Sequence, residues 1–562
     1  MTKKQSRGNI LRRDAFKLGG AAALAMATLV SSRTDTFAQS AEAPVVTTKE
    51  GQLRGTSTER LNIFKGVHYG ETTGGKGRFR HPVALQPFEG FRDASKVGDP
   101  CFQNNPDWEG WKENNNGSED CLVLNVWAPK GSKDKPVMVY FHGGAYMYGS
   151  GGAPMYDAAG LAERGDVVAI TVNHRLHALG FMHLADISPD YRGQSNAGLA
   201  DLVEALRWVK RNISAFGGSP DNVTIFGESG GGGKVNCLLS MPSAQGLFHK
   251  AIVQSGSQAH LRDPAQATTD ARAALKILNI GEDELSKLEQ IDPQSIWDAY
   301  IKVSESNIRG GLSDAAFSPV LDAETLPFAP GSSEAIALSK AIPVLVGSNQ
   351  AEGTFPLLIA NMLKAPTDEK GMIDSLLQLF PKIGEQHRAD LQALVATYNV
   401  KRPGEDLLNQ IVGVSTEIWM GSDAIRQAES RAAANTAPVY MYRFGWKEPC
   451  FGGAWATHAA ELPFVFDNLE IDLIWGDANL ESLRDKYDPE KKRYAFRDTV
   501  IGAWSSFARD GKPSASGIPD WPEYDLESKS TMLLDKNSSV VNDPLGPEMR
   551  TGLMKIDAGI GS

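Results

Sequence analysis

Thr224-Ile-Phe-Gly-Glu-Ser-Gly-Gly-Gly-Gly233 contains the pattern G-x-S-x-G, with glycines two positions before and two positions after Ser229. In a tight turn between a strand and a helix, larger residues at those two positions would collide, and glycine avoids this because it has no Cβ. Upstream, Asn222–Phe226 has the β-branched and aromatic composition of a short buried strand. Downstream, Lys234–Met241 is predicted to be helical. The order strand, turn, helix predicts a turn that exposes a serine nucleophile.

Two other interpretations of this stretch fit its residues less well. A phosphate-binding loop would need glycine at position 228 and serine or threonine at 235, but the chain has Glu228 and Val235. A purely structural turn is also disfavoured, because successive glycines at the head of a helix cost up to ~1 kcal/mol each relative to alanine. Close approach of the backbone, or an open pocket beside the serine, explains the glycines better.

Composition places the chain among ordinary globular proteins. It has 562 residues, of which 41% are hydrophobic and 22% charged, and a formal net charge of -11. That is enough material for a large core. The acidic balance argues against nucleic acid and against anionic membrane surfaces, both of which favour basic patches. Four cysteines in so long a chain do not make a disulfide scaffold.

Residues 1–38 are predicted to be an export signal rather than part of the fold. Arg12 and Arg13 precede the weakly apolar run Leu18–Val30, and Thr36-Phe-Ala38 supplies small residues for cleavage. The run is too short for a stable membrane span, which needs ~20 residues, although an uncleaved anchor is an alternative. The paired arginines resemble a twin-arginine signal, which exports folded proteins to the periplasm or the medium. The mature chain, 39–562, is then expected in an oxidising compartment.

The mature chain alternates predicted strands with predicted helices, which implies a mostly parallel sheet with helices on both faces. We expect a single α/β domain with helical, cap-like insertions, the first at about 260–335. The stretches 51–55 and 63–69 are predicted to form an opening hairpin. The other predicted elements are strands at 136–142, 166–173, 250–255, 341–347 and 437–443, the last clear strand, and helices at 199–216 and 494–509.

A serine hydroxyl needs a base, and the base needs an acid that orients it. In sheet enzymes with this turn, the chain order is serine, acid, histidine. Of the two distant downstream histidines, His387 lies in a polar helical stretch, whereas His458 follows the last clear strand. Glu352 directly follows the strand 341–347, and strand ends on one edge of a parallel sheet converge. Ser229, Glu352 and His458 are therefore the predicted catalytic residues.

The negatively charged oxygen that forms during acyl transfer needs backbone N–H donors. Gly143 and Gly144 follow the strand 136–142, and Gly230 follows the serine. Together these three residues are predicted to form the oxyanion hole.

With these residues, the chain resembles the type-B carboxylesterase/cholinesterase family of α/β-hydrolases. The matching motifs run in family order over about residues 45–545: 118–126, 141–145, 173–176, 215–229, 254–257, 347–353 and 458–466. The resemblance implies the same catalytic residues and oxyanion hole, a disulfide between Cys101 and Cys121, and a buried Ser255 beside the acid. Gly230 stands where the family usually has alanine, which predicts a more open acyl pocket. His177 also replaces a residue that is commonly small.

The resemblance implies hydrolysis of small carboxylic esters through an acyl-enzyme, without metal or cofactor, nucleic acid or stable membrane insertion. Carbamates, amides and lactones are alternatives, because the same residues attack all of them. A catalytically idle adhesion homologue is disfavoured, since all three catalytic residues are present. Trp111 is expected to line the entrance and contact substrate, although Trp108 could occupy that site instead. The sequence leaves the oligomeric state open.

Overall fold

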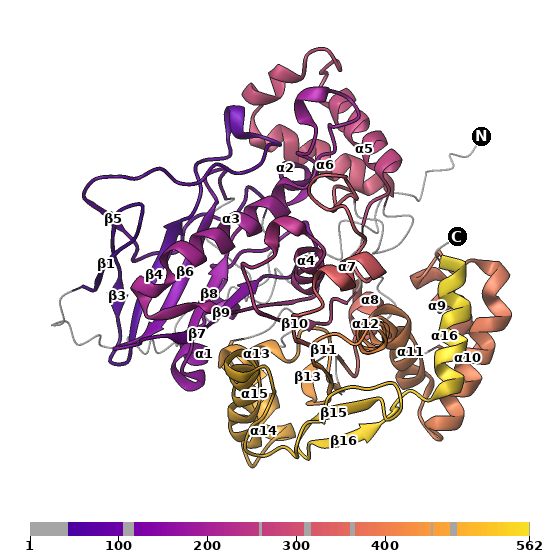
Figure 1. Ribbon diagram of the computed structural model, residues 1–562. Coiled ribbons are helices and arrows are strands. Elements are labelled where there is room, and N and C mark those ends of the chain that lie inside the picture. The colour runs from indigo at the N-terminus through magenta and orange to yellow at the C-terminus, as the bar shows by residue number, and fades with distance from the viewer. Residues whose placement is uncertain are drawn as a thin grey trace, which may run out of the picture. The chain divides into compact units, whose positions relative to one another are not determined.

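The computed structural model describes residues 43–104, 117–257, 261–307, 316–359, 366–450, 453–471 and 480–560 (Figure 1). All that follows concerns the compact unit that begins at Ala43. The predicted export signal, Trp108 and Trp111 lie outside the described residues.

The framework of the unit is an 11-stranded sheet among the described residues. Every neighbouring pair from β8 to β15 is parallel, and antiparallel pairs flank this block at both edges. In spatial order the strands are β16 (Ser539–Asn542), β15 (Ser530–Leu534), β12 (Val439–Phe444), β11 (Val344–Asn349), β10 (Lys250–Gln254), β9 (Gly218–Glu228), β7 (Lys135–Phe141), β8 (Val168–Val172), β6 (Val123–Pro129), β4 (Leu61–His68) and β3 (Thr56–Ser57).

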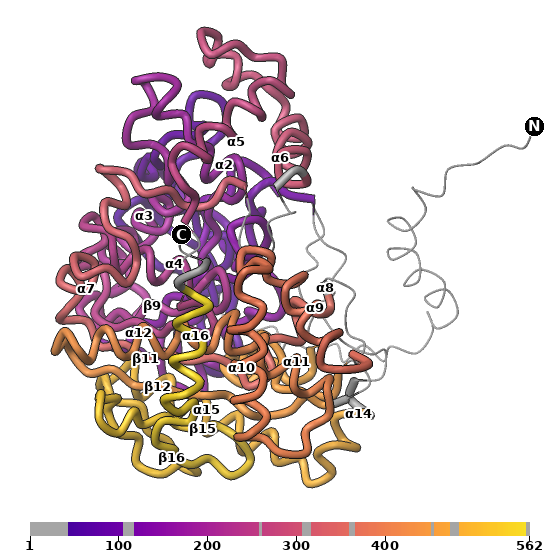
Figure 2. Tube along the Cα trace, turned by 90° about the vertical axis from the view of Figure 1, so that its right-hand side faces the viewer, coloured from indigo at the N-terminus to yellow at the C-terminus, as the bar shows by residue number. Residues whose placement is uncertain are grey.

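Helices cover both faces of this sheet (Figure 1). The described α-helices are α1 (Ala159–Gly165), α2 (His177–Phe181), α3 (Ala197–Asn212), α4 (Gly230–Leu239), α5 (Pro264–Ile277), α6 (Pro293–Asn307), α7 (Ser333–Leu338), α8 (Thr354–Ile359), α9 (Glu369–Leu379), α10 (Arg388–Lys401), α11 (Leu407–Thr416), α12 (Ser422–Ala433), α13 (Leu462–Phe466), α14 (Leu480–Tyr487), α15 (Lys492–Asp510) and α16 (Pro547–Ile560). The C-terminal helix α16 packs beside α10 (Figure 2).

The side chains of the central strands divide between two hydrophobic cores. In β7, Val137, Val139 and Phe141 belong to the core under α3, α4 and α12, whereas Met138 and Tyr140 belong to the core under α1, α13 and α15. This alternation follows from the two-residue period of a strand. Because both faces are covered, the parallel strands are apolar throughout, which is why the sequence reveals them.

The structure confirms the predicted fold class, a mostly parallel sheet with helices on both sides, but it corrects two details. The expected opening hairpin is wrong. Residues 52–54 form β2, which pairs with β1 (Val45–Thr47) and β5 (Phe91–Asp93), whereas β4 pairs with β3 and β6 in the large sheet. The strand 437–443 is also not the last, because β15 and β16 extend the sheet beyond it.

The disulfide expected between Cys101 and Cys121 is not formed in the structure, where both carry buried free thiols. Their side chains are nevertheless hydrogen-bonded to each other. Burial alone would raise the pKa of Cys101. Hydrogen bonds outweigh this effect and lower the pKa to about 6; they come from the Cys121 thiol, His177 and the Leu176 amide. Whether such a pair is bonded depends on the redox potential around it as well as on geometry. Cys237 and Cys450 are also buried free cysteines.

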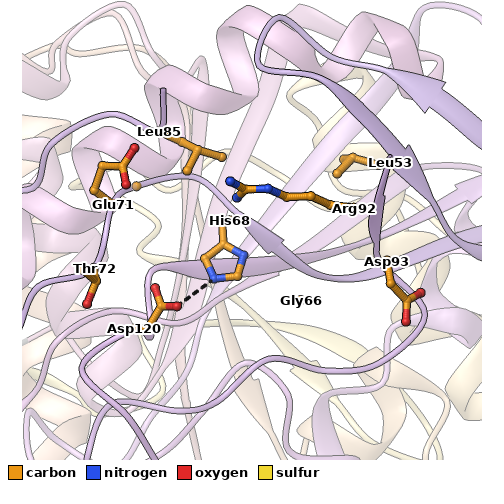
Figure 3. A pocket seen from close by; sticks show the side chains of 10 residues that line it. Leu53, Gly66, His68, Glu71, Thr72, Leu85, Arg92, Asp93 and Asp120 are labelled. Atoms are coloured by element: carbon orange, nitrogen blue, oxygen red, sulfur yellow. Dashed lines mark ion pairs between the residues drawn. The ribbon is translucent and has the colours of Figure 1, made fainter. Parts of the chain in front are cut away.

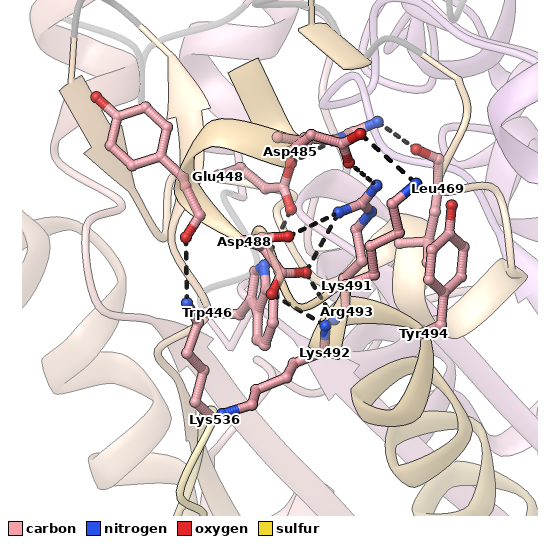
Figure 4. A network of polar contacts seen from close by, with 12 residues as sticks. Trp446, Glu448, Leu469, Asp485, Asp488, Lys491, Lys492, Arg493, Tyr494 and Lys536 are labelled. Atoms are coloured by element: carbon pink, nitrogen blue, oxygen red, sulfur yellow. Dashed lines mark hydrogen bonds and ion pairs between the residues drawn. The ribbon is translucent and has the colours of Figure 1, made fainter. Parts of the chain in front are cut away.

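A polar network fixes the two-stranded hairpin β13 (Glu448–Cys450) and β14 (Gly453–Trp455), which directly precedes His458 (Figure 4). Glu448 accepts hydrogen bonds from Trp446 Nε1 at 3.0 Å and from Arg484 Nε at 2.5 Å, and Arg484 also donates to the Leu469 carbonyl. Arg484 belongs to α14, so the network ties the hairpin to that helix.

No helix in the described ranges is long and apolar enough to cross a membrane.

Candidate active site

Ser229 lies at the turn between β9 and α4, with φ 57° and ψ -126°. A side chain other than glycine's would not fit around it. A Cβ on Gly227 would lie 2.5 Å from the backbone of Gly231, and a Cβ on Gly231 would lie 2.0 Å from the Phe141 carbonyl. The Ser229 amide donates to the Gln254 carbonyl at 2.9 Å. The turn is thus held in a sparsely populated conformation by its surroundings, as is common at functional sites.

Glu352 and His458 come together at the carboxyl edge of the sheet. His458 Nδ1 and Glu352 Oε2 are 2.6 Å apart, and both side chains are buried. The other carboxylate oxygen of Glu352 accepts hydrogen bonds from Ser255 Oγ at 2.5 Å and the Asn349 amide at 2.7 Å. Glu352 is therefore held on both oxygens, and Ser255 lies where the resemblance implies.

Two further buried carboxylates surround His458, and the sequence did not identify either. Glu228 Oε1 lies 3.3 Å from His458 Nε2 and has no hydrogen-bond partner among the residues that the structure describes. Glu461 accepts hydrogen bonds from Gln254 Nε2 at 3.0 Å and from Asn349 Nδ2 at 2.7 Å. Their positions next to the serine and three residues after the histidine were the available signal, but only burial distinguishes them from ordinary surface acids.

These carboxylates control the protonation of the site. Burial, reinforced by Glu461 and Glu352, raises the pKa of Glu228 to about 8. Burial would lower the pKa of His458, but the negative charges of Glu228 and Glu352 outweigh it and raise that pKa to about 9. Both His458 and the neighbouring Glu228 therefore keep their protons to a higher pH than usual. For His458 the reason is that nearby carboxylate charges favour the protonated imidazole.

Gly143 approaches Ser229 closely. A Cβ on Gly143 would lie 3.5 Å from the Cβ of Ser229, and Gly144 has φ 80°. In the described part of the chain, the N–H groups of Gly143, Gly144 and Gly230 donate no hydrogen bond. These three N–H groups therefore have no competing acceptor in the described residues, which leaves them able to serve as oxyanion donors.

The expectation that Gly230 opens the acyl pocket is not supported. A Cβ at position 230 would lie 2.3 Å from the Ala145 carbonyl oxygen and 2.4 Å from the Ala145 Cα. The missing side chain is replaced by the backbone of the loop that carries Gly143 and Gly144. Gly230 therefore lets this loop come close to the serine rather than leaving space for substrate.

Two aromatic side chains, neither of them predicted, flank His458. Phe355 and Trp419 stack with ring centroids 5.5 Å apart and an interplanar angle of 3°. Their centroids lie 5.0 Å and 4.9 Å from the His458 ring. Trp419 belongs to a single π-helical turn, Glu417–Gly421, between α11 and α12. Such turns are rare and are frequent at functional sites.

The remaining sequence candidates lie elsewhere. His387 is partly exposed at the start of α10, with Nδ1 3.3 Å from Asp390 Oδ2. His177 is buried with φ 43°, its Nε2 lies 2.7 Å from the Phe102 carbonyl, and its ring packs on Trp297 and Tyr300. His177 thus replaces a small residue by packing under α6. The described residues contain no group of three or more His, Cys, Asp or Glu arranged to hold a metal ion.

A cavity of about 490 Å³ lies apart from these residues, beside β4 (Figure 3). Its wall includes His68, which forms a 3.4 Å ion pair with Asp120, together with Glu71 and Arg92. None of Ser229, Glu352 and His458 lines it. The cavity has no nucleophile with a base beside it, so the strained serine and its partners remain the candidate active site.

Comparison with known proteins agrees with this geometry. Residues 42–551 match the carboxylesterase family. A para-nitrobenzyl esterase of Bacillus subtilis (strain 168) is 35% identical over 509 residues, which cover 89% of this chain and 96% of that protein. A phenmedipham hydrolase of Pseudarthrobacter oxydans is 31% identical over 515 residues, covering 90% and 98%. A solved PNB esterase structure has a TM-score of 0.77 at 33% identity and covers 91% of this chain and 99% of that one. The chain therefore belongs to the carboxylesterase family, has the α/β-hydrolase fold, and is a serine hydrolase of carboxylic esters.

Proposed function

We propose that Ser229 is the nucleophile, His458 the general base and Glu352 the acid that orients it. Ser229 Oγ attacks the ester carbonyl while His458 accepts its proton, and the oxygen becomes negatively charged between the amides of Gly143, Gly144 and Gly230. His458 then protonates the departing alkoxide, which leaves an acyl group on Ser229. Water, deprotonated by His458, attacks this ester and releases the carboxylic acid and the free serine.

The observation that carries the proposal is the 2.6 Å contact between His458 Nδ1 and Glu352 beside a strained serine. A carboxylate at Nδ1 holds the proton on that nitrogen, which leaves Nε2 to exchange protons with the reacting groups. In the structure Nε2 faces Glu228 at 3.3 Å. Binding of substrate has to bring Nε2 into partnership with Ser229, because catalytic hydrogen bonds often tighten only in the substrate complex.

The test is hydrolysis of p-nitrophenyl butyrate by Ser229→Ala and His458→Ala, separately and together. We expect kcat to fall by about 10⁴-fold or more in each single variant, with no further loss in the double variant, because the two residues act as a unit. Near-ultraviolet circular dichroism checks that each variant is folded. Substantial turnover by folded Ser229→Ala would disprove the assignment.

Carboxylic esters are the bond class that this site favours, because an alkoxide leaves more easily than an amide nitrogen. Carbamates, amides and lactones are secondary candidates, and one relative is named a phenmedipham hydrolase. A panel of p-nitrophenyl esters of graded chain length, with carbamate and amide analogues of the same acyl size, ranks them. Faster turnover of the carbamates than of every ester would reverse the preference.

The export of the protein through the N-terminal 38 residues is part of the same proposal and rests on Arg12, Arg13 and the apolar run after them. In an oxidising compartment a disulfide oxidant would convert the contacting thiols of Cys101 and Cys121 into a disulfide, releasing two electrons and two protons to the oxidant. Mass spectrometry of the exported protein without reduction tests this. Two alkylatable thiols at these positions in denatured protein would refute it.

Trp111 remains proposed as an aromatic wall of the entrance, on sequence grounds alone. Trp111→Ala should raise KM for bulky aromatic esters more than for acetates. An equal shift for both ester classes would mean that Trp111 only packs its loop.

A further inference from the structure

Lys234 is a buried lysine without a counter-ion, directly behind the proposed oxyanion hole. It lies on α4, five residues after Ser229, and its side chain is completely buried. Within the described residues it forms no ion pair. An ammonium is costly in the core without a carboxylate partner, and burial accordingly lowers the pKa of Lys234 to about 7. The presence of this amine in a tightly packed core calls for a functional reason.

The ammonium has one hydrogen-bond acceptor in the described residues. Lys234 Nζ donates to the His142 carbonyl oxygen at 2.9 Å. The groups around it include the ring of Tyr146, whose centroid lies 5.6 Å from Nζ, the stacked imidazoles of His142 and His174, and the buried thiol of Cys237, whose pKa burial raises to about 12. Burial and the charge of Lys234 lower the pKa of both histidines well below the ordinary value, so both imidazoles are neutral.

The carbonyl that accepts from Lys234 belongs to His142, the residue before the proposed oxyanion donor Gly143. The C=O of His142 and the N–H of Gly143 belong to one peptide group, so the Lys234 amine that donates to the oxygen polarises the N–H donor, most strongly when the amine is protonated. A hydrogen bond at one end of a peptide strengthens the hydrogen bond at the other end, and more so at low dielectric. The imidazole of His142 adds rigidity, because its Nδ1 lies 2.9 Å from the Gly143 carbonyl.

We propose that Lys234 is a positioning residue of the oxyanion hole, which fixes and polarises the His142–Gly143 peptide so that the Gly143 N–H stabilises the oxyanion. This inference rests on the proposed function, because it requires an oxyanion beside Ser229. Lys234 touches neither substrate nor Ser229 and acts only through the peptide. The interaction is felt mainly in the transition state, when the carbonyl oxygen of the substrate becomes negatively charged.

The experiment compares wild type with Lys234→Met, which keeps the length of the side chain and removes its charge. With p-nitrophenyl acetate, kcat should fall about 10- to 100-fold, less than the loss for deleting an oxyanion donor outright, while KM stays within about twofold. A trifluoromethyl ketone, which adds to Ser229 and forms an oxyanion, should bind more weakly by the same factor. The corresponding carbinol, which forms no oxyanion, should bind equally well to both proteins.

Lys210→Met is the matched control, because Lys210 Nζ also donates to a backbone carbonyl, that of Gly246, at 3.0 Å, but on the exposed side of α3. It should leave kcat and both inhibitors unchanged. Lys234→Gln serves if Lys234→Met does not fold, and it should give a smaller loss with the same ketone selectivity. Unchanged kcat, or equal weakening of ketone and carbinol, would overturn the role of Lys234 while Ser229→Ala remained inactive. Activity in Ser229→Ala would instead remove the underlying function.

Discussion

At the scale of single residues, the candidate active site is a histidine held among three buried carboxylates, only one of which is the proposed orienting acid. Glu352 contacts Nδ1, Glu228 faces Nε2, and Glu461 is held behind them by Gln254 and Asn349. Concentrating negative charge around one imidazole stabilises the imidazolium that forms during catalysis. The same negative charge makes the imidazolium of the free enzyme harder to deprotonate. A smaller fraction of His458 is then the neutral base at a given pH, while the imidazolium formed during catalysis is stabilised.

Glu228→Gln tests this balance. His458 must be neutral to act as a base, so kcat/KM rises with pH as His458 loses its proton. With a pKa raised to about 9, this rising limb of the pH profile lies above neutral pH. Removing the charge of Glu228 lowers the pKa of His458 and moves the limb to lower pH. Below both limbs, each unit of displacement is a tenfold gain in relative rate.

The measurement is the pH profile of kcat/KM for p-nitrophenyl acetate in both proteins. Glu282→Gln is a suitable control, because Glu282 is an exposed acid that pairs with Arg272 at 2.8 Å. An unmoved limb, or one displaced to higher pH, would contradict the electrostatic account. A lower plateau at high pH would be compatible with it, since Glu228 also stabilises the imidazolium.

At the scale of elements, the π-helical turn between α11 and α12 brings Trp419 onto Phe355 and His458. A π turn inserts one extra residue into a helix and redirects the side chains that follow. Here the redirected ring is half-buried against the base. The turn therefore shapes the wall of the site and restrains the imidazole.

Trp419→Ala should remove both effects. We expect kcat/KM for p-nitrophenyl benzoate to fall about tenfold more than for the acetate, because an aromatic acyl group loses a ring contact worth ~0.5–1.5 kcal/mol in addition to buried area. Trp419→Phe keeps an aromatic ring and should retain most of the selectivity. Equal losses for benzoate and acetate would show that Trp419 only supports the fold.

The sequence predicts the central strands well because each is apolar on both faces. It fails for β15, Ser530–Leu534, where five residues of mixed polarity follow a polar stretch. It also mispairs β2 and β4, because nearness in sequence suggests a hairpin while β4 pairs with β6, far along the chain. The proposed nucleophile and acid, Ser229 and Glu352, lie just after the ends of β9 and β11, which is why the strand pattern points to them. Glu228, Trp419 and Lys234 are not, because their roles depend on what folding buries around them.

At the scale of the whole molecule, the compact unit begins at Ala43, and the predicted export signal precedes it in the sequence. If export depends on the arginine pair, replacing Arg12 and Arg13 together with lysine should retain the precursor inside the cell, since a receptor reads the pair and not only its charge. Cell fractionation with esterase activity as the readout measures this. Normal export of the double variant would indicate the general secretory route.

The order of strands in the sheet also has a consequence for how the protein is made. The proposed site brings together residue 143, just after β7, and residues 229, 352 and 458. The three long segments between these residues must therefore fold before any ester can be cleaved. Closing such long loops makes folding slow, and synthesis at ~5–20 residues per second delivers 562 residues in roughly half a minute to two minutes. The N-terminal segment emerges from the ribosome first and catalytic competence arrives last. Throughout that interval the half-built sheet presents unpaired strand edges, which can pair with other chains.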